Sequence, residues 1–314
     1  MQKTFFTIIV VSYNAGDELL RTIESISAQT YENYRVLIKD GMSTDGSLDR
    51  LRERYDMSGA DDAFEKKITL LESCDNGIYH AMNIAVAFLL DKVQQVREKG
   101  GLSPEGNSEP FHRVNETPTY IFFLNCGDYF ASPDVLQKVH DEIEGRHSKE
   151  GTTIPSIFYG DIYDRSSDSK VASNPKIDDH ACYRNVPSHQ ACFYDERLIY
   201  GHPFDLNYKV RADYEHFLRC YYRDKAETFY IPVMIADYQG GGYSDRNKKI
   251  SEREREEIIK KYLPLSKIRK YDLIRAITLA PLRTALSSNK VTSGAYNGLK
   301  TAVYSFRNKK NNKE

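Results

Sequence analysis

The chain has 314 residues, 40% hydrophobic and 28% charged, which is enough for a large α/β domain with an appendage and excludes wholesale disorder. The formal net charge of -1 excludes a protein that binds nucleic acid through its overall charge. Five scattered cysteines without a CxxC pair favour reduced thiols in a cytoplasmic protein over disulfides or a zinc site. The sequence predicts neither a membrane-spanning helix nor a secretory signal.

The first part of the chain alternates short apolar runs, rich in β-branched residues, with segments of helical spacing. The runs at residues 5–11, 34–39 and 68–71 are typical of buried parallel strands. This order predicts a parallel sheet with right-handed crossovers, whose ligands bind beyond the carboxyl ends of the strands. The polar turns at 12–16 and 40–46 are therefore expected at the ligand-binding edge. Neither the GxGxxG fingerprint of dinucleotide sites nor a P-loop motif is present.

In the middle of the chain, a strongly apolar predicted strand is followed by a carboxylate. Residues 98–118 are rich in Gly, Pro, Ser, Asn and Glu, which predicts an exposed insertion. The strand predicted at 120–124 then runs directly into the sequence NCGD, which ends at Asp128. A carboxylate in this position suits a metal or a ligand, although Asp128 would equally serve as a cap for the next turn or helix.

The second half continues with strands predicted at 157–163 and 187–194, the latter opened by a polar turn. A helix is expected to begin near Asp213, whose carboxylate would cap it. The glycine-rich stretch 238–244 is either a mobile segment that closes over a ligand or a linker to the C-terminal region.

The charge is distributed unevenly along the chain. Residues 246–314 contain 18 basic and 6 acidic residues, whereas residues 1–245 contain 26 basic and 39 acidic residues. Apolar residues spaced by three or four between Leu263 and Leu282 predict helices interleaved with basic residues. Such a basic amphipathic extension suits an anionic membrane surface. It would equally suit a helix pair packed on the main domain with its basic face in solvent, and the sequence leaves both open.

Four segments occur in a fixed order: VVSYN at 10–14, DGMSTDG at 40–46, DNGIYHAMN at 75–83 and FLNCGD at 123–128. Together they resemble family 2 glycosyltransferases with the GT-A fold, especially those that build bacterial surface polysaccharides. The resemblance covers about residues 4–245. It implies a Rossmann-like, mostly parallel central sheet flanked by helices.

The resemblance also implies a domain organisation and an activity. Residues 1–245 would form the catalytic domain, with a nucleotide-sugar half over about 1–130 and an acceptor half over about 131–245, followed by the helical extension 246–314. The expected reaction is the inverting transfer of a hexosyl or N-acetylhexosaminyl group. A nucleotide diphosphate sugar, expected to be a UDP-sugar, would be the donor, and a saccharide or lipid-linked saccharide the acceptor. The enzyme would work on cell-surface polysaccharide at the inner face of the membrane.

The resemblance places the nucleotide against three side chains. Tyr13 would stack on the base, Asp40 would accept a hydrogen bond from it, and Asp75 would lie near the ribose and diphosphate. A flat ring suits a flat base, and a carboxylate suits the N–H of uracil. Each residue also has a structural interpretation: Tyr13 would pack on its turn, and Asp40 and Asp75 would bond to the backbone of theirs.

Asp128 matches the last acid of the family's metal-binding motif. Mg²⁺ and Mn²⁺ accept carboxylate oxygens, phosphates and water, so the resemblance implies one of these ions on the donor diphosphate. The chain departs from many relatives in having Gly127 where they have a second acid, and Asn125 is neutral. The nucleotide would therefore supply most of the metal ligands.

The acceptor side is assigned to the second half of the chain. His189 and Gln190 resemble a pair that faces the cleft in the family, near the phosphate or the acceptor. Asp213 matches the catalytic base, which must take the proton of the acceptor hydroxyl as the bond to the sugar forms. Glu215 is the alternative base if the register differs.

Two other functions remain open from the sequence. A nucleotidyltransferase also uses a nucleotide, a metal and an α/β sheet, but the first turn lacks the expected glycine-rich loop and basic residue. A degenerate nucleotide- or saccharide-binding module would fit the incomplete acidic motif. The presence of both Asp128 and Asp213 favours an enzyme over such a module.

Overall fold

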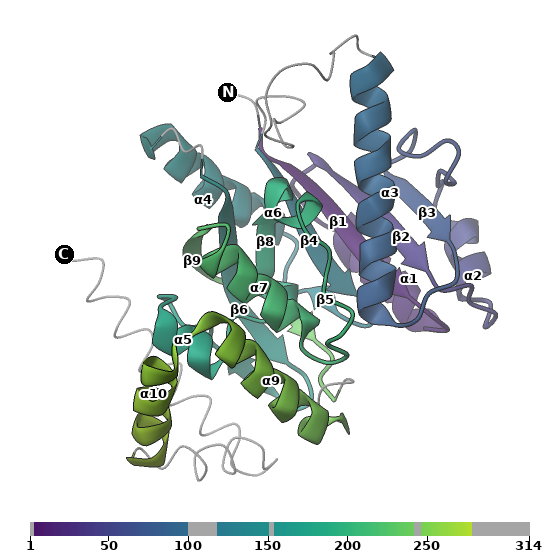
Figure 1. Cartoon of the computed structure of the whole chain (residues 1–314). Helices are drawn as coiled ribbons and strands as arrows, with labels where there is room; N and C mark the ends of the chain where they lie inside the picture. The colour runs from purple at the N-terminus through teal and green to yellow at the C-terminus, as the bar shows by residue number, and fades with distance from the viewer. Residues whose placement is uncertain (1–2, 100–117, 151–153, 242–245, 278–314) are drawn as a thin grey trace.

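The computed structural model describes residues 3–99, 118–150, 154–241 and 246–277. Nearly all of the predicted insertion at 98–118 and the C-terminal part of the predicted extension lie outside these residues. One central sheet organises the chain, in the strand order β3-β2-β1-β4-β8-β6-β9-β5, with β7 paired to β6 at the side (Figure 1).

The N-terminal half of the sheet is parallel throughout. Its strands and helices follow the predicted alternation: β1 (Phe5–Ser12), α1 (Asp17–Ser27), β2 (Tyr34–Asp40), α2 (Ser47–Arg54), β3 (Ile68–Glu72), α3 (Ile78–Lys99) and β4 (Thr119–Asn125). The register pairs Ser12 with Asp40 and Val11 with Asn125, so the carboxyl ends of neighbouring strands lie level. The polar segments that follow these strands therefore lie along one edge.

The C-terminal half of the sheet is mixed, because β8 runs antiparallel to both β4 and β6 whereas β9 is parallel to β6. Its strands are β5 (Tyr129–Phe130), β6 (Ser156–Asp164), β7 (Ser169–Val171), β8 (Cys192–Asp195) and β9 (Glu227–Tyr238). Its helices are α4 (Val135–Glu150), α5 (Asp179–Arg184), the 3-10 helix η1 (His189–Ala191), α6 (Glu196–Tyr200), α7 (Ala212–Tyr222), α9 (Lys248–Tyr262) and α10 (Leu265–Ile277). The predicted α/β class with a mostly parallel sheet is confirmed.

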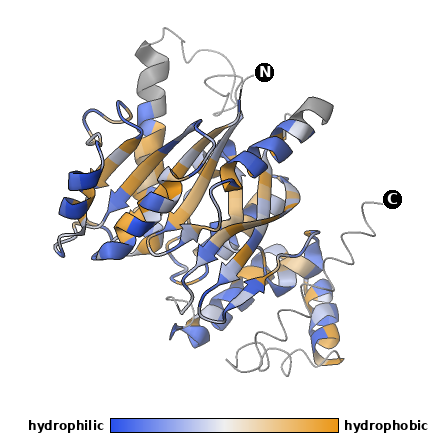
Figure 2. Ribbon diagram, turned by 180° about the vertical axis from the view of Figure 1, so that it is seen from behind, coloured by the Kyte–Doolittle hydropathy of each residue, from blue (hydrophilic) through white to orange (hydrophobic). Residues whose placement is uncertain are grey.

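Helices cover both faces of the sheet, which explains why the strands are apolar along their whole length (Figure 2). Alternate residues of β1 point to opposite faces: Ile9 packs with α3 and α7, whereas Ile8 packs with α1 and α4. Two buried apolar layers therefore hold the sheet, and the edge that carries the polar segments is left for ligands.

One local prediction in the second half is wrong. The predicted strand at 187–194 begins only at Cys192, because His189 and Gln190 belong to η1, which turns their side chains toward the carboxyl end of β4. The helix expected near Asp213 begins at Ala212, and its N-cap is Arg211, so Asp213 lies in the first turn and is not the cap.

Helix α9 is an integral part of the packed domain. Ile258 and Ile259 are buried against the core around α7. The carboxylate of Glu254, also buried, accepts hydrogen bonds of 2.9–3.0 Å from the backbone N–H groups of residues 209–211. Three such bonds to one charged acceptor fix the loop that leads into Asp213.

Helix α10 packs far less tightly. Tyr271 lies 5.3 Å from the ring of Tyr183 on α5, but no residue of α10 is fully buried. Leu265, Leu273 and Ile277 are exposed. In the part of the chain that the structure describes, no helix is long and apolar enough to cross a membrane.

Candidate active site

The candidate site follows the carboxyl ends of the parallel strands. Asp75 follows β3, Asp40 ends β2, Tyr13 follows β1, and Asp128 follows β4. Because the sheet order is β3-β2-β1-β4, these four residues succeed one another along a single edge in that order. This is the edge at which ligands bind in open α/β sheets.

The three residues predicted to bind the nucleotide lie close together. The ring of Tyr13 is 66% exposed and lies over Gly41, since a β-carbon at Gly41 would be 3.0 Å from Tyr13 Cδ2. The same β-carbon would be 3.1 Å from the carboxylate of Asp75, so the small glycine lets both side chains approach the second turn. Tyr13 thus presents an open ring face at this edge.

Asp40 is fully buried, and its two carboxylate oxygens accept hydrogen bonds from the backbone N–H (2.7 Å) and hydroxyl (2.8 Å) of Ser43. Its side chain therefore has the structural role that the sequence left open and shapes the second turn. Asp75 forms an ion pair of 2.6 Å with Lys39, whose ammonium group is buried at the end of β2. The sequence analysis did not single out Lys39, because its partner follows 36 residues later in the chain.

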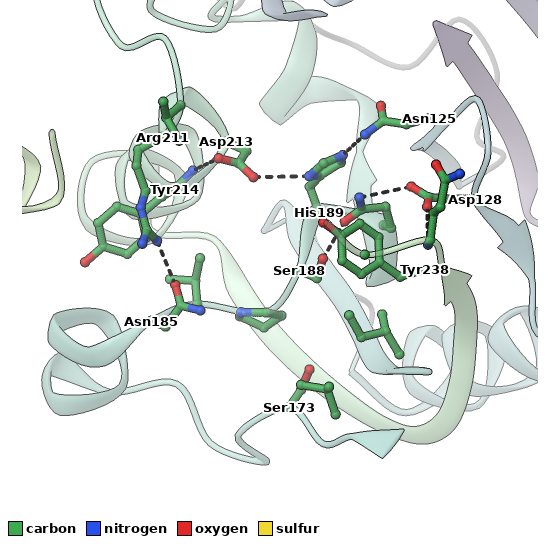
Figure 3. Close-up of a pocket in the computed structure, with 18 of the residues that line it drawn as sticks. Asn125, Asp128, Ser173, Asn185, Ser188, His189, Arg211, Asp213, Tyr214 and Tyr238 are labelled. Atoms are coloured by element: carbon green, nitrogen blue, oxygen red, sulfur yellow. Dashed lines mark hydrogen bonds and ion pairs between the residues drawn. The ribbon is translucent and has the colours of Figure 1, made fainter. Parts of the chain in front are cut away.

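A cavity of about 530 Å³ opens beside this cluster (Figure 3). Asp128 and Asp213 both line it, together with His189 and Gln190. The two acids predicted to work together therefore share one cavity, although they are 85 positions apart in the chain. The described lining of the cavity does not include Tyr13, Asp40 or Asp75.

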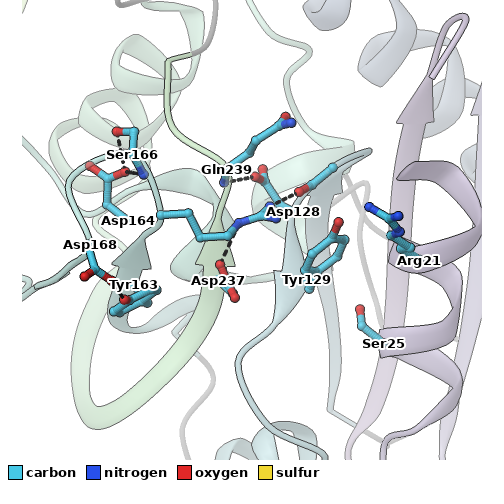
Figure 4. A network of polar contacts seen from close by, with 12 residues as sticks. Arg21, Ser25, Asp128, Tyr129, Tyr163, Asp164, Ser166, Asp168, Asp237 and Gln239 are labelled. Carbon is cyan, nitrogen blue, oxygen red and sulfur yellow. Dashed lines mark hydrogen bonds and ion pairs between the residues drawn. The ribbon is translucent and has the colours of Figure 1, made fainter. Parts of the chain in front are cut away.

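Asp128 is only 3% exposed, and both of its oxygens are oriented by hydrogen bonds. Oδ1 accepts from the backbone N–H of Gln239 at 2.9 Å (Figure 4). Oδ2 accepts from the side-chain amide of Gln190 at 3.1 Å. Burial raises the pKa of Asp128, although these two hydrogen bonds and the charges of His189 and Arg165 act in the opposite direction. A nearby cation would stabilise the ionised form of this carboxylate.

The backbone conformation at position 127 favours the glycine that this chain has in place of a second acid. Gly127 has φ +95, a conformation that side-chain-bearing residues rarely adopt, and a β-carbon there would lie 2.8 Å from the side-chain oxygen of Gln239. A second acid at this position would thus be strained in this chain. Consistent with that, no group of three or more His, Cys, Asp or Glu side chains that could hold a metal occurs among the described residues.

Asp213 is 27% exposed in its side chain and is held from two sides. Its Oδ1 accepts from the hydroxyl of Tyr79 at 2.9 Å and from the backbone N–H of Tyr214 at 2.8 Å, while Oδ2 lies 3.1 Å from His189 Nδ1. Burial alone would raise the pKa of Asp213, but the hydrogen bonds from His189 and Tyr79 outweigh it and lower the pKa. Asp213 is therefore ionised at neutral pH and can accept a proton.

His189 links the two sides of the cavity. Its Nε2 lies 2.9 Å from the amide nitrogen of Asn125, so a neutral ring accepts at Nε2 and donates from Nδ1 to Asp213. This arrangement leaves the buried side-chain oxygen of Asn125 without a hydrogen-bond partner. Consecutive residues thus hold the two acids, since His189 contacts Asp213 and Gln190 contacts Asp128.

Tyr79 and Asn125 are site residues whose roles the sequence analysis missed, although both lie inside the motifs that it singled out. Glu215, the alternative base, is buried elsewhere, where it accepts hydrogen bonds from Lys261 (2.6 Å) and Tyr262 (2.5 Å). It is not among the residues that line the cavity. The described site therefore contains Asp213 and not Glu215.

The chain is similar in sequence to known glycosyltransferases. Residues 7–92 match the family model described as glycosyl transferase family 2. The PGL/p-HBAD biosynthesis glycosyltransferase of Mycobacterium bovis (strain BCG / Pasteur 1173P2) is 27% identical over 248 residues, which cover 78% of this chain and 81% of that protein. The protein of the same name from Mycobacterium tuberculosis (strain ATCC 25177 / H37Ra) matches to the same extent.

Solved structures share the fold. The crystal structure of S. aureus TarS 1-349 superposes with a TM-score of 0.52 at 13% identity, and the match covers 75% of this chain. This chain spans 60% of the length of that structure. The structure of TarS 1-349 in complex with UDP gives a TM-score of 0.53 at 13% identity and covers 82% of this chain and 70% of that one.

The fold and these relatives define a glycosyltransferase enzyme. They favour sugar transfer over a nucleotidyltransferase or a binding module. As the ordered motifs predicted, residues 7–92 match family 2 glycosyltransferases, and the chain has the GT-A fold.

Proposed function

We propose that the enzyme transfers a sugar from a nucleotide diphosphate donor to a hydroxyl of a saccharide or lipid-linked saccharide, with inversion, in the synthesis of cell-surface polysaccharide. The observation that carries this proposal is the shared cavity, which is lined by one buried carboxylate, Asp128, and one proton-accepting carboxylate, Asp213. Two carboxylates with pKa values shifted in opposite directions suit two different tasks.

In this mechanism Asp213 is the general base. Its Oδ2 receives one hydrogen bond, from His189, and keeps a lone pair for the acceptor hydroxyl. As the acceptor oxygen bonds to C1 of the sugar, its proton moves to Asp213, and the bond from C1 to the diphosphate oxygen breaks with the electron pair leaving on the phosphate. A single displacement from the opposite side inverts the configuration at C1.

The leaving diphosphate is assigned to the Asp128 side of the cavity. The residues fit a divalent ion there in part: Asp128 offers a carboxylate, and the unpartnered side-chain oxygen of Asn125 offers a second hard ligand in the same cavity. When bound, Mg²⁺ or Mn²⁺ would neutralise the developing phosphate charge. With two protein oxygens available, we expect the ion to bind together with the nucleotide.

The nucleotide is assigned to the cluster beside the cavity. The exposed ring of Tyr13 would stack on the base, and Asp75, oriented by Lys39, would face the ribose and diphosphate. Asp40 would act indirectly, because its oxygens fix the turn on which Tyr13 lies. The TarS structures in complex with UDP and with UDP-GlcNAc support a uridine nucleotide in this fold.

A thermal-shift screen tests the donor. UDP-, GDP- and dTDP-sugars are added to the full-length protein with and without Mn²⁺. A ligand that binds only the folded protein raises the melting temperature, so a UDP-sugar with Mn²⁺ is expected to give the largest rise. Tyr13→Ala should reduce this rise, because it removes the ring but leaves the fold unchanged. The absence of any shift with all three nucleotide sugars would contradict the proposal.

We further propose that helix α10 draws the enzyme to the inner face of the cell membrane, where a lipid-linked acceptor would lie. Leu265, Leu273 and Ile277 are exposed on it, and Arg269 and Lys270 are exposed between them. Exposed apolar side chains next to basic ones suit an anionic lipid surface. Helix α9 has a different role, since it packs on the catalytic domain.

Vesicle binding tests this role of α10. Reversing both charges, in Arg269→Glu with Lys270→Glu, is expected to weaken sedimentation with phosphatidylglycerol vesicles by at least about fivefold, because each basic residue near such a surface contributes about 1 kcal/mol. Phosphatidylcholine vesicles are the control lipid. Deleting the whole extension would not be a clean test, because Glu254 holds the loop before Asp213. Equal binding by the wild type and the double variant would show that α10 only packs.

A further inference from the structure

The cavity has more positive than negative side chains in its described lining. Arg184, Lys209 and Arg211 line it, whereas Asp128 and Asp213 are the only carboxylates among the described residues of the lining. Three cations thus share the described lining with two carboxylates. Within the described ranges, none of the three cations forms an ion pair.

Neutral groups hold Arg211 in place. Its Nε donates to the hydroxyl of Ser251 at 2.8 Å, and its Nη1 donates to the side-chain oxygen of Asn185 at 3.3 Å. The guanidinium carbon lies 5.7 Å from the centre of the Tyr214 ring. These contacts fix the orientation of the guanidinium group without an ion pair.

The acid on the neighbouring helix does not neutralise this region through an ion pair. The carboxylate of Glu254 is buried, and it accepts hydrogen bonds from the backbone N–H groups of residues 209–211. These bonds hold the segment that carries Lys209 and Arg211 at the cavity. Arg184 ends helix α5 on the other side, and both Arg184 and Lys209 are exposed to solvent. The cations that line the cavity thus lie on a fixed framework.

The positions of the two acids assign the end of the cavity near Arg211 to the acceptor. In Figure 3, Arg211 and Asn185 lie at the end opposite Asp128, with Asp213 and His189 between them. If the diphosphate leaves on the Asp128 side, the group that approaches Asp213 from the basic end is the acceptor. Arg211, at the end opposite Asp128, then lies on the side of the acceptor and not on that of the leaving group.

We propose that the acceptor of this enzyme carries a negatively charged group, a phosphate or a carboxylate, close to the hydroxyl that receives the sugar. Arginine side chains bind both kinds of anion, and Lys209 adds a point charge. Ser173 and Ser188 line the same cavity and offer hydroxyl groups to a sugar ring. This inference rests on the proposed function, because it uses the assignment of Asp213 as the base.

Binding of small anionic sugars to the full-length protein tests the inference. Glucose 1-phosphate, glucuronate and methyl glucoside share a hexose ring and differ in charge, so calorimetry with each measures the contribution of the anion. UDP is added first to occupy the nucleotide site, and its own thermal shift is recorded on the same samples. A loss of nucleotide binding is therefore measured separately from a failure to prefer anionic sugars.

We expect at least one charged sugar to bind about tenfold more tightly than methyl glucoside, and the preferred probe identifies phosphate or carboxylate as the anion. Arg184→Glu with Lys209→Glu, at two exposed positions, should abolish this preference, and high salt should weaken it. Arg269→Glu with Lys270→Glu makes the same charge change away from the cavity and should retain it. Equal binding of all three probes by the wild type, or an unchanged preference in Arg184→Glu with Lys209→Glu, would overturn the inference.

Discussion

Asp213→Asn is expected to lower the rate of sugar transfer by about 10²–10⁴-fold, because an amide cannot accept the proton of the acceptor hydroxyl. The shape of the site should be retained, since the asparagine oxygen can still accept the hydrogen bond that Tyr79 donates. Donor binding should therefore remain nearly intact. Transfer is measured as sugar incorporated into an acceptor, and donor binding as the rise in melting temperature relative to the same variant without ligand.

Asp49→Asn is the matched control for this substitution. Asp49 is 79% exposed in its side chain and lies on α2, away from the cavity, so the same chemical change there should leave transfer unaltered. Near-normal turnover by Asp213→Asn would remove Asp213 from the role of base. A loss of donor binding equal to the loss of transfer would instead indicate a general disruption of the site.

The pH profile gives a second readout for the same residue. The ionised carboxylate is the active form, so kcat/KM should rise with pH through the pKa of Asp213 and then level off. Because the hydrogen bond from His189 helps to lower this pKa, the rise should lie below the usual aspartate range in the wild type. His189→Ala removes that donor and should move the rise to higher pH. A profile that is unchanged in His189→Ala would contradict the link between these two side chains.

The sequence predicted the strands and their order because the parallel half of the sheet is buried on both faces and its strands are continuously apolar. It also located the ligand-binding edge, since polar segments follow each of these strands. The same reasoning failed at 187–194, where the apolar run that forms β8 does not show that His189 and Gln190 precede the strand in a 3-10 turn. Only contacts with Asn125 and Asp128, about 60 residues earlier, reveal why.

Other features were hidden from the sequence for the same physical reason. The loop before α7 is held by Glu254, which follows it by more than 40 residues. The pairing of Lys39 with Asp75 and of Tyr79 with Asp213 likewise joins distant segments. A local pattern identifies which residue types could do chemistry, but the side chains that orient them are set by tertiary packing.

Asp128→Asn should separate the stability of the fold from its function. Burial raises the pKa of this carboxylate, so its ionised form is disfavoured in the folded protein, and stability is lost as pH rises from the unfolded pKa through the folded one. At neutral pH the neutral amide removes this cost. The melting temperature of the ligand-free variant is therefore expected to equal or exceed that of the wild type.

Function should change in the opposite direction. Without the carboxylate, the described lining of the cavity keeps one acid, Asp213, which is assigned to the base and not to the leaving group. The additional thermal shift that Mn²⁺ gives to a bound UDP-sugar should disappear, and transfer should fall by about 10²–10³-fold, the usual effect of removing one group that stabilises developing charge. Both are measured on the same samples as the ligand-free melting temperature.

Asp224→Asn is the matched control for Asp128→Asn. Burial also raises the pKa of Asp224, but this residue lies between α7 and β9 and is not part of the cavity lining. The control variant should share the retained or increased melting temperature and keep both the Mn²⁺-dependent shift and full transfer. If Asp128→Asn kept the Mn²⁺-dependent shift as well, the ion would have to be held by other groups, and the buried acid at the end of β4 would be a structural residue. If the Mn²⁺-dependent shift and transfer are lost in Asp128→Asn but not in Asp224→Asn, the carboxylate of Asp128 serves the leaving group.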